Sequence, residues 1–518
     1  MNESVNIFVG ENDAGKTTIL EALSMGLTGK INGSSIISKL NVDWFNLKTR
    51  NEYKDKIEKG EEPALPSIEI EIFLEGILES DNYFIHYKGS NNSLREDAVG
   101  IKVSVKFNNE YSQTYKQLLK EKKIIDIPIE LYKVEFSSFA NQEYYITKTD
   151  KKLAIIDTTK KDYGVVLNRF VSNSITNYLS EKDETNLRLA YRGNRKDFID
   201  SPEVAGLNSK LKNEYKFGNR EISLNLRAGE IDDWKNEMSL SVDKIPFENV
   251  GFGTQNMIKA EMVFNQNTDV DFLLLEEPEN NLSYSNMSVL ISKLADNNTK
   301  QLFISTHSSY VANKLGLNNL HLVCNTKTKP LTKLPNDAFD FFVKLPGYNT
   351  LRVLLANKII LVEGPADELI VQRAYRDTYG KLPIDAGIDV MSVNGTAFKS
   401  YCELALLIEK KIVIVTDNDR SLKKVHERYK KYSDVVSLCV EDDEKLYTLE
   451  PSVLNANKDN FDDFKSIIYK RNDDLSYDDL CKFMLNNKTE WAMRVFKSEK
   501  NIKYPKYILN AIGANADE

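Results

Sequence analysis

A glycine-rich loop set between a short apolar run and a helical pattern constrains the fold of this chain more than any other feature. The run Val5–Val9 predicts a buried strand, and apolar residues at helical spacing begin at Ile19. The loop between them reads GENDAGKT, in which backbone N–H groups curl around phosphates, Lys16 reaches the terminal phosphates and Thr17 holds Mg²⁺. The residues expected to contact nucleotide or its metal ion are Gly10, Asn12, Gly15, Lys16, Thr17 and Thr18. The alternative is an incidental glycine loop.

A second apolar run ends in the carboxylates that a phosphate loop requires. Phe272–Leu275 is followed directly by Glu276 and Glu277. Such a loop needs one carboxylate in the Mg²⁺ shell and one that orients the attacking water, so we expect Glu276 to serve the metal ion and Glu277 to be catalytic. His307, after the short strand Leu302–Ile304, is expected to sense a terminal phosphate. The alternatives are a charged turn and a structural histidine.

The C-terminal third of the chain contains strand patterns at 359–362, 390–393 and 412–415 that alternate with helical patterns, which predicts a parallel α/β unit. Acidic residues follow the first and third strands, namely Glu363, Asp367, Glu368, Asp417 and Asp419. The carboxyl ends of parallel strands meet at one edge of a sheet, so these carboxylates can converge. Their repulsion requires a cation, and hard oxygen ligands suit Mg²⁺ or Mn²⁺ in phosphodiester chemistry. The alternative is a solvated sheet edge.

A glycine-rich turn at 249–255 leads into another helical pattern. With the loop and the carboxylates, it resembles the ABC-type ATPases of the SMC, Rad50 and OLD (overcoming lysogenization defect) kind. The resemblance implies that Gly251, Gly253 and Gln255 contact ATP across the interface of a homodimer; an ordinary helix N-terminus is the alternative. These heads usually have a strand and turn before the phosphate-loop strand. Here only a few residues precede it, so we expect either a truncated start or fewer adenine contacts.

The C-terminal carboxylates resemble the TOPRIM domain of topoisomerases, primases and OLD nucleases, with its Glu-Gly and Asp-x-Asp elements. The resemblance implies that the metal ligands Glu363, Asp367, Asp417 and Asp419 are catalytic. It further implies that Glu450 joins the metal shell and that Lys488 stabilises negative charge on the scissile phosphate. Without the resemblance, Glu450 is equally well a loop residue and Lys488 a solvated helix residue.

The order of the motifs resembles an OLD nuclease along nearly the whole chain. It implies an ABC-type ATPase head formed by residues 1–160 and 217–335, a helical insertion at 161–216 that acts as a dimerisation arm, and a Rossmann-like TOPRIM domain at 336–518. Within the head, alternation at 68–74 and 103–107 predicts half-exposed antiparallel strands.

The resemblance implies an ATP-regulated, divalent-metal-dependent DNA endonuclease or nickase. Its relatives include the Gabija nuclease subunit and retron-associated OLD nucleases, which implies a cytoplasmic antiviral defence role, a homodimer or higher homo-oligomer, phage or plasmid DNA bound through its backbone, and a companion defence protein or retron RNA–DNA. The rival is a non-catalytic ATP-driven clamp or sensor with a structural metal site. A TOPRIM primase or topoisomerase fits less well, since no primer-synthesis context or nucleophilic tyrosine domain is recognisable.

Composition sets weaker bounds on the partners. The 518 residues include 69 Lys and Arg against 77 Asp and Glu, and the net charge of −8 argues mildly against nucleic acid. Several of these acids are proposed cation ligands, however, and a basic run follows Asp419: Arg420, Lys423, Lys424, Arg428, Lys430 and Lys431. No apolar run approaches the ~18 residues of a membrane helix, and no secretory signal is evident. Four cysteines without CxxC spacing predict reduced thiols in a cytosol.

Overall fold

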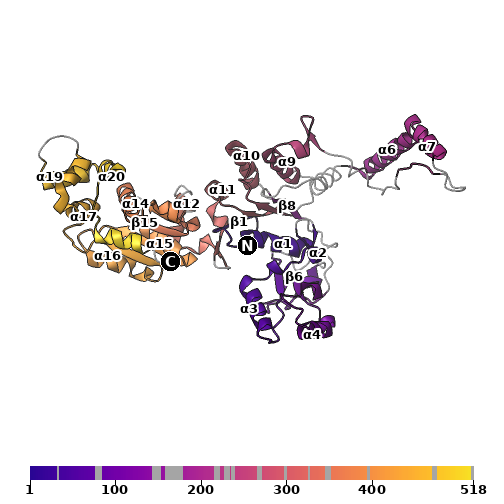
Figure 1. Cartoon of the computed structure of the whole chain (residues 1–518), viewed down its shortest axis with the longest axis horizontal. Coiled ribbons are helices and arrows are strands. Elements are labelled where there is room, and N and C mark those ends of the chain that lie inside the picture. Colours follow the sequence, from indigo (N-terminus) through magenta and orange to yellow (C-terminus); the bar gives the residue numbers. More distant parts are fainter. Residues whose placement is uncertain are drawn as a thin grey trace. The chain divides into compact units, whose positions relative to one another are not determined.

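The computed structural model describes residues 1–31, 34–75, 84–142, 153–157, 179–214, 222–226, 234, 240–264, 271–296, 300–324, 327–344, 352–393, 397–469 and 475–514. The chain divides into two compact units, one formed by Met1–Lys16 with Thr306–Glu518 and the other by Thr17–Ser305. Helices and strands are intermixed in both units (Figure 1), which is the α/β class that the sequence predicts.

The unit Thr17–Ser305 contains an antiparallel sheet. Its strands are β4 (Ile68–Phe73), β5 (Lys88–Gly89), β6 (Ala98–Phe107) and β7 (Tyr132–Ser138). Val103 pairs with Ile70 on one side and with Phe136 on the other, which confirms the strands expected from alternation. The helices that supply buried side chains to the same core are α1 (Lys16–Thr28), α2 (Ile36–Lys39), α3 (Leu47–Glu58) and α4 (Ser112–Lys120).

The same unit holds three parallel strands, β8 (Leu153–Asp157), β11 (Phe272–Glu276) and β12 (Gln301–Ser305). The central strand is β11, where Leu274 pairs with Phe303 of β12 and with Ile155 of β8. Two helices accompany this sheet, α9 (Phe252–Phe264) and α10 (Tyr284–Ala295), and α9 contacts both α10 and β8. The register brings Glu276 to the carboxyl end of β11, as the sequence predicts.

Within the insertion expected at 161–216, the described residues form two helices, α6 (Glu181–Ile199) and α7 (Pro202–Glu214), which contact each other. Ser180 and Asp183 form a reciprocal capping box that begins α6. The apolar side chains of Leu189, Phe198 and Leu207 are exposed on these helices. The first part of the expected insertion, residues 161–178, lies outside the described residues.

The unit Met1–Lys16 with Thr306–Glu518 begins with β1 (Val5–Val9), a fully buried strand. It pairs in parallel with β13 (Leu320–Cys324), which in turn pairs with the antiparallel β14 (Lys327–Pro330). Two helices flank these strands in the sequence: α11 (Ser309–Lys314) precedes β13, and α12 (Asn336–Lys344) follows β14. The phosphate loop therefore begins at the end of a strand whose side chains are all buried.

The C-terminal part of this unit is a four-stranded parallel sheet in the order β16, β15, β17, β18. The strands are β15 (Lys358–Val362), β16 (Ile388–Ser392), β17 (Ile412–Thr416) and β18 (Val436–Val440). The helices are α14 (Pro365–Tyr379), α15 (Phe398–Ile408), α16 (Leu422–Tyr429), α17 (Leu449–Ala456), α18 (Phe461–Ile468), α19 (Tyr477–Asn486), α20 (Lys488–Lys497) and α21 (Lys506–Gly513). The three strands expected here are confirmed to within two residues at each end.

One apolar core joins this sheet to α14, α17, α18, α19, α20 and α21, so that the last hundred residues complete the domain and do not form a separate one. All four strands run in the same direction, and their carboxyl ends therefore lie at a single edge. Among the described residues, none of the helices has the length and apolar character to cross a membrane.

Candidate functional site

The phosphate loop has the local geometry that its sequence predicts. The Lys16 ammonium is buried and donates to the carbonyl oxygens of Gly10 at 3.1 Å and Glu11 at 2.8 Å. A Cβ on Gly10 would lie 2.4 Å from the carbonyl oxygen of Val323, and Gly15 has a φ of +99°. Both positions therefore require glycine, one for close backbone approach and one for a left-handed conformation. Asn12 and Thr18 are exposed at the loop and at the first turn of α1.

The carboxylates after β11 make hydrogen bonds within the unit Thr17–Ser305. The Thr17 hydroxyl donates to the Glu276 carboxylate, which joins the two side chains expected to share an Mg²⁺ ion. Glu277 has a φ of 45°, and its backbone N–H donates to the carbonyl oxygen of Ser305 at 2.9 Å. Its carboxylate accepts a hydrogen bond of 2.6 Å from the Asn280 amide. Glu277 is thus held on a strained turn, a feature often found where catalytic side chains are positioned.

The remaining predicted ATPase residues are placed as follows. His307 lies half-buried immediately after β12 and Thr306. Gly251 is exposed, whereas a Cβ on Gly253 would lie 2.4 Å from the Asn281 carbonyl oxygen, so that only glycine fits there. Gln255 is buried, and its amide donates to the carbonyl oxygens of Phe247 at 2.9 Å and Val250 at 2.8 Å. Gln255 therefore shapes the turn that leads into α9.

The acidic residues after β15 and β17 meet at the carboxyl edge of the C-terminal sheet. The backbone N–H of Asp417 donates to the Glu363 carboxylate at 3.4 Å. Asp367, in the first turn of α14, accepts a hydrogen bond of 3.1 Å from the N–H of Gly364. The ends of two strands and one helix N-terminus therefore carry these three acidic residues at the same edge of the sheet.

The carboxylates at this edge lie close enough to act on one another electrostatically. Burial, followed by the charges of Glu363 and Glu450, raises the pKa of Asp367 to about 7. Burial, followed by the charges of Glu363, Asp367 and Glu450, raises the pKa of Asp417 to about 9, although Lys488 opposes this. The pKa of Glu363 is raised chiefly by burial, and the charge of Asp419 adds to the effect. The cluster favours a bound proton or cation over full ionisation.

Glu450 and Lys488 reach the same edge from helices far along the chain. Glu450, in the first turn of α17, is 1% exposed, and its Oε1 lies 3.8 Å from the Nζ of Lys488, the first residue of α20. Its Oε2 is buried and has no hydrogen-bond partner among the described residues. A buried carboxylate oxygen without a partner is costly, and a cation ligand would satisfy it.

Two of the predicted metal residues differ from this group, Glu368 in its direction and Asp419 in its exposure, although the charge of Asp419 still acts on Glu363. Glu368 is directed to β16, where its carboxylate accepts from the N–H of Ser392 at 3.3 Å and from the Gln372 amide at 3.3 Å. Asp419 is exposed, with a φ of 49°. As the side chains lie, no group of three or more His, Cys, Asp or Glu residues in the described part of the chain could hold a metal ion.

The donor chemistry nevertheless fits a hard divalent cation. All the clustered side chains are carboxylates, burial and the neighbouring charges raise the pKa values of Asp367 and Asp417, and one buried oxygen of Glu450 lacks a partner. Oxygen ligands of this kind are those that Mg²⁺ and Mn²⁺ prefer. The types of side chain present therefore fit such an ion.

Sequence reasoning missed one residue that shapes this edge. Asn418, between the two aspartates, is fully buried, and its amide donates to the carbonyl oxygens of Glu441 at 3.0 Å and Asp443 at 2.9 Å. The Oδ1 of its side-chain amide accepts from the backbone N–H of Arg420 at 2.9 Å. A polar residue between two metal-type aspartates is the only signal for this role in the sequence.

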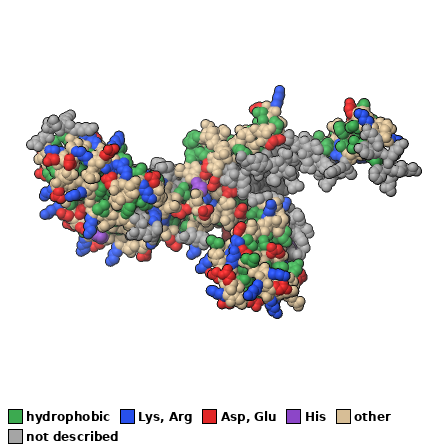
Figure 2. Space-filling model, in the orientation of Figure 1, with side chains coloured by type: hydrophobic (Ala, Val, Ile, Leu, Met, Phe, Trp, Pro, Cys, Tyr) green, Lys and Arg blue, Asp and Glu red, His purple; other side chains and the backbone are tan. Residues whose placement is uncertain are grey.

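The basic run after Asp419 lies largely on α16, and its lysine and arginine side chains are exposed. Arg428 is close enough to lower the pKa of Glu363, and the Arg420 guanidinium lies 4.1 Å from the centre of the Tyr447 ring. On the face seen in Figure 2, Lys and Arg side chains of this domain are interspersed with acidic ones. The cluster of carboxylates is thus bordered by cations, although no single basic patch dominates that view.

Two family models match the regions of the chain that contain these sites. A model described as "AAA domain, putative AbiEii toxin, Type IV TA system" matches residues 5–313, which include the phosphate loop, Glu276, Glu277 and His307. A model described as "Overcoming lysogenization defect protein-like, TOPRIM domain" matches residues 354–419. The first match covers more than half of the chain, which therefore belongs to that AAA-domain family, and its combination with an OLD-like TOPRIM domain matches the OLD family of ATPase–TOPRIM nucleases. Its two matched regions are those of an ATP-dependent nuclease of the OLD type, and a TOPRIM nuclease domain implies a nucleic-acid substrate.

The OLD-type TOPRIM match ends at residue 419, so it includes Glu363, Asp367, Asp417 and Asp419 but neither Glu450 nor Lys488. None of the curated proteins matches the chain. Among solved structures, the crystal structure of Stu0660 of Streptococcus thermophilus aligns with 44% of this chain and 73% of that chain, at 11% identity and a TM-score of 0.20. A likeness at that level carries no argument about this OLD-family chain.

Proposed function

We propose that this OLD-family protein is an ATP-regulated, divalent-metal-dependent endonuclease that nicks or cleaves DNA. The observation that supports it most is the convergence of Glu363, Asp367, Asp417 and Glu450 with Lys488 at one edge of a parallel sheet. A merely structural ion pair would not need four carboxylates so close together that, besides burial, the neighbouring charges raise the pKa values of Asp367 and Asp417. A role in bacterial defence against phage follows from the family resemblance.

In this proposal the cation is held by carboxylates from two strands and two helices. The ligands are Glu363, Asp367, Asp417, Asp419 and Glu450. A bound Mg²⁺ or Mn²⁺ supplies Lewis acidity and lowers the pKa of coordinated water. Lys488 stabilises negative charge that develops on the scissile phosphate, and its position as the first residue of α20 adds the positive end of the helix dipole.

The ATPase residues act on a different phosphate. Lys16 binds the terminal phosphates, Thr17 and Glu276 hold the nucleotide's Mg²⁺, and Glu277 orients the attacking water. Hydrolysis of a phosphodiester is already favourable, so ATP serves to gate access to DNA and supplies no bond energy. His307 senses the terminal phosphate.

The nucleotide also joins two copies of the chain. We assign Gly251, Gly253 and Gln255 to the ATP contact across a homodimer interface, with Gln255 acting through the turn that it holds. The domain boundaries proposed from the sequence are retained, with the ATPase head at 1–160 and 217–335, the dimerisation arm at 161–216 and the TOPRIM domain at 336–518. The exposed Leu189, Phe198 and Leu207 on α6 and α7 suit an arm that packs against a second copy.

A plasmid assay tests the nuclease. Supercoiled DNA incubated with the protein and Mg²⁺ or Mn²⁺ should give relaxed or linear product that EDTA abolishes. Asp417→Asn should reduce the rate by at least about 100-fold, since even outer-shell partners of metal ligands cost roughly 10- to 100-fold. The matched control is Asp434→Asn, which alters an exposed aspartate of the same domain. Cleavage that survives Asp417→Asn, with ATP binding intact, would contradict the assignment.

The rival function is an ATP-driven clamp with a structural cation. The two functions differ in a direct way: a clamp binds plasmid in an ATP-dependent manner and leaves it supercoiled at every metal concentration. Nicked product in metal alone excludes the clamp.

A further inference from the structure

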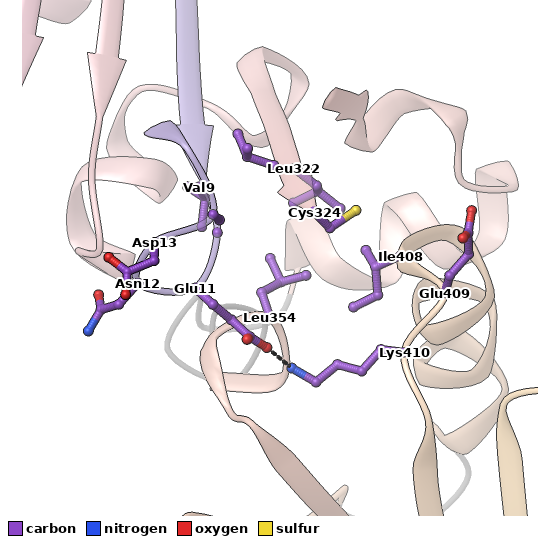
Figure 3. A pocket seen from close by; sticks show the side chains of 13 residues that line it. Val9, Glu11, Asn12, Asp13, Leu322, Cys324, Leu354, Ile408, Glu409 and Lys410 are labelled. Atoms are coloured by element: carbon purple, nitrogen blue, oxygen red, sulfur yellow. Dashed lines mark hydrogen bonds and ion pairs between the residues drawn. The ribbon is translucent and has the colours of Figure 1, made fainter. Parts of the chain in front are cut away.

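A cavity of about 380 Å³ lies between the first half of the phosphate loop and the turn that joins α15 to β17 (Figure 3). Apolar side chains such as Leu354 and Ile408 line it, and one charged pair spans it. The Lys410 ammonium donates to the Glu11 carboxylate at 2.7 Å. Glu11 belongs to the phosphate loop, whereas Lys410 belongs to the TOPRIM domain of the same compact unit.

Lys410 is the more fixed member of this pair. Its side chain is 11% exposed, against 44% for Glu11, and the same ammonium donates to the carbonyl oxygen of Ala356. Its backbone N–H donates to the carbonyl of Ala405 at 3.0 Å, in a turn where Glu409 adopts a left-handed φ of 57°. The cation is therefore held by the end of α15, and loss of Glu11 would leave a largely buried charge with less compensation.

The two segments that Lys410 joins lead directly into the strands that carry the acidic cluster. Ala356 stands two residues before β15, and Lys410 stands two residues before β17. These strands are buried neighbours, with Leu361 paired to Ile414. Each has five residues and spans roughly 17 Å at about 3.3 Å per residue. Glu363 and Asp417 follow their far ends, so a displacement at Lys410 is carried along two close-packed strands to the carboxylates.

Glu11 is also tied to the nucleotide lysine. Its main-chain carbonyl accepts from Lys16 at 2.8 Å, while its side chain accepts from Lys410. A terminal phosphate competes for the same ammonium protons of Lys16, because charge-assisted hydrogen bonds are stronger than those to a neutral carbonyl. Nucleotide binding therefore changes the hydrogen bonds that hold Glu11, and Glu11 is the ionic partner of Lys410.

We propose that Lys410 is a positioning residue that couples the nucleotide state of the phosphate loop to the spacing of the carboxylates at the far ends of β15 and β17. The coupling rests on the proposed function, since ATP and a divalent cation are the ligands at its two ends. It assigns a specific route to the regulation: phosphate loop, Glu11, Lys410, then the paired strands. Allosteric coupling of this kind typically changes affinity or rate by roughly 5- to 150-fold.

The test compares Lys410→Met, which keeps the aliphatic stem and removes the charge, with Lys329→Met. Lys329 donates to the carbonyl of Leu407 at 2.8 Å and to Glu409 at 2.5 Å, so it holds the same turn from β14. Two quantities are measured with and without ATP: the plasmid cleavage rate and the hydrogen–deuterium exchange of residues 358–363 and 412–417. ATP affinity is measured separately with a fluorescent analogue.

In the wild type, ATP should change both the cleavage rate and the exchange of these strands. Lys410→Met should bring the ratio of the cleavage rates with and without ATP closer to one by about fivefold or more. It should also remove the ATP-dependent change in hydrogen–deuterium exchange and leave the cleavage rate in metal alone unchanged. Glu11→Gln should reproduce the change in ratio, and the exchange of charges in Glu11→Lys with Lys410→Glu should restore part of it. Lys329→Met should keep the wild-type response.

Three results would overturn the coupling: strands whose exchange ignores ATP in the wild type, a wild-type response in Lys410→Met, or an equal loss in Lys329→Met. A protein that never cleaves DNA but shows ATP-dependent exchange that Lys410→Met removes would contradict the nuclease and support the coupling. The two proposals therefore fail separately.

Discussion

Metal binding at the acidic edge should compete with protons, and the structure gives the size of the effect. The pKa of Asp417 is raised to about 9 and that of Asp367 to about 7. At pH 7, Asp417 is then almost fully protonated and Asp367 is half protonated. A cation that needs both carboxylates ionised should displace about 1.5 protons at this pH. Between pH 7 and pH 9 the apparent Mg²⁺ affinity should rise about 100-fold, roughly 50-fold of it from Asp417.

Isothermal titration calorimetry measures this directly. Titration of Mg²⁺ at pH 7 in two buffers of different ionisation enthalpy gives the number of protons released, and titrations from pH 7 to pH 9 give the slope. Asp417→Asn should reduce the release to about half a proton. Glu368→Gln is the matched control, because Glu368 is directed to Ser392 of β16. Proton release near zero, or an affinity that changes less than about threefold across this range, would refute the clustered arrangement.

The raised pKa values of Asp367 and Asp417 also determine whether the folded state gains or loses stability as the pH rises. Carboxylates whose pKa values are raised in the folded state favour folding most below the unfolded value near 4, and this contribution is lost as the pH rises through the folded values of about 7 and about 9. Without metal, the melting temperature of the TOPRIM transition should therefore fall between pH 4 and pH 9. Mg²⁺ should reverse the fall at the alkaline end, as measured by differential scanning calorimetry.

Three further outcomes can be measured independently. Lys488→Met should lower the cleavage rate by about 10²- to 10³-fold and leave the calorimetric Mg²⁺ affinity within about threefold, because the lysine acts on the phosphate; a large loss of Mg²⁺ affinity would assign it to the metal shell instead. Gly10→Ala should weaken ATP binding by at least roughly fivefold, since its Cβ would meet the Val323 carbonyl at 2.4 Å. Gly193→Ala, where nothing lies within 4 Å, should not weaken it, and equal affinities for both variants would contradict the steric argument. Arg373→Met should destabilise the TOPRIM domain by about 3 kcal/mol in urea unfolding, because the buried guanidinium donates to Asp377 and to the carbonyl of Val495; a change below about 1 kcal/mol would refute that role.

The strands and their acidic ends could be predicted because local pattern decides them. Apolar runs of four or five residues that end in a carboxylate fold as buried parallel strands, and the edge at which they end follows from their common direction. For this reason Glu276 lies beside Thr17, and Glu363 lies beside Asp417, as the sequence predicts. The placement of Glu368 could not be predicted, because a helix turn decides which of two adjacent acids faces the cluster and which faces β16.

The meeting of Glu450 and Lys488 could not be predicted from the local sequence pattern. They lie 38 positions apart on different helices, and no spacing rule joins them. Their meeting depends on how α17 and α20 pack on the shared core, in which Val453 and Trp491 are fully buried. Only family resemblance suggested these two residues in advance, and the burial of Glu450 and its distance from the exposed Lys488 follow from how the helices pack.

Lys410 illustrates a different limit. It belongs to no motif, and in the sequence it is one of two adjacent lysines before an apolar strand. Its role emerges from topology: in a parallel sheet the amino ends of β15 and β17 also lie together, at the edge opposite the carboxylates. A ligand that acts on the amino edge therefore reaches the catalytic edge through the strands themselves, without a dedicated connecting element. The phosphate loop meets that amino edge through Glu11, and this is why the ATPase motif and the carboxylate motif, 350 residues apart in sequence, can respond to each other through one lysine.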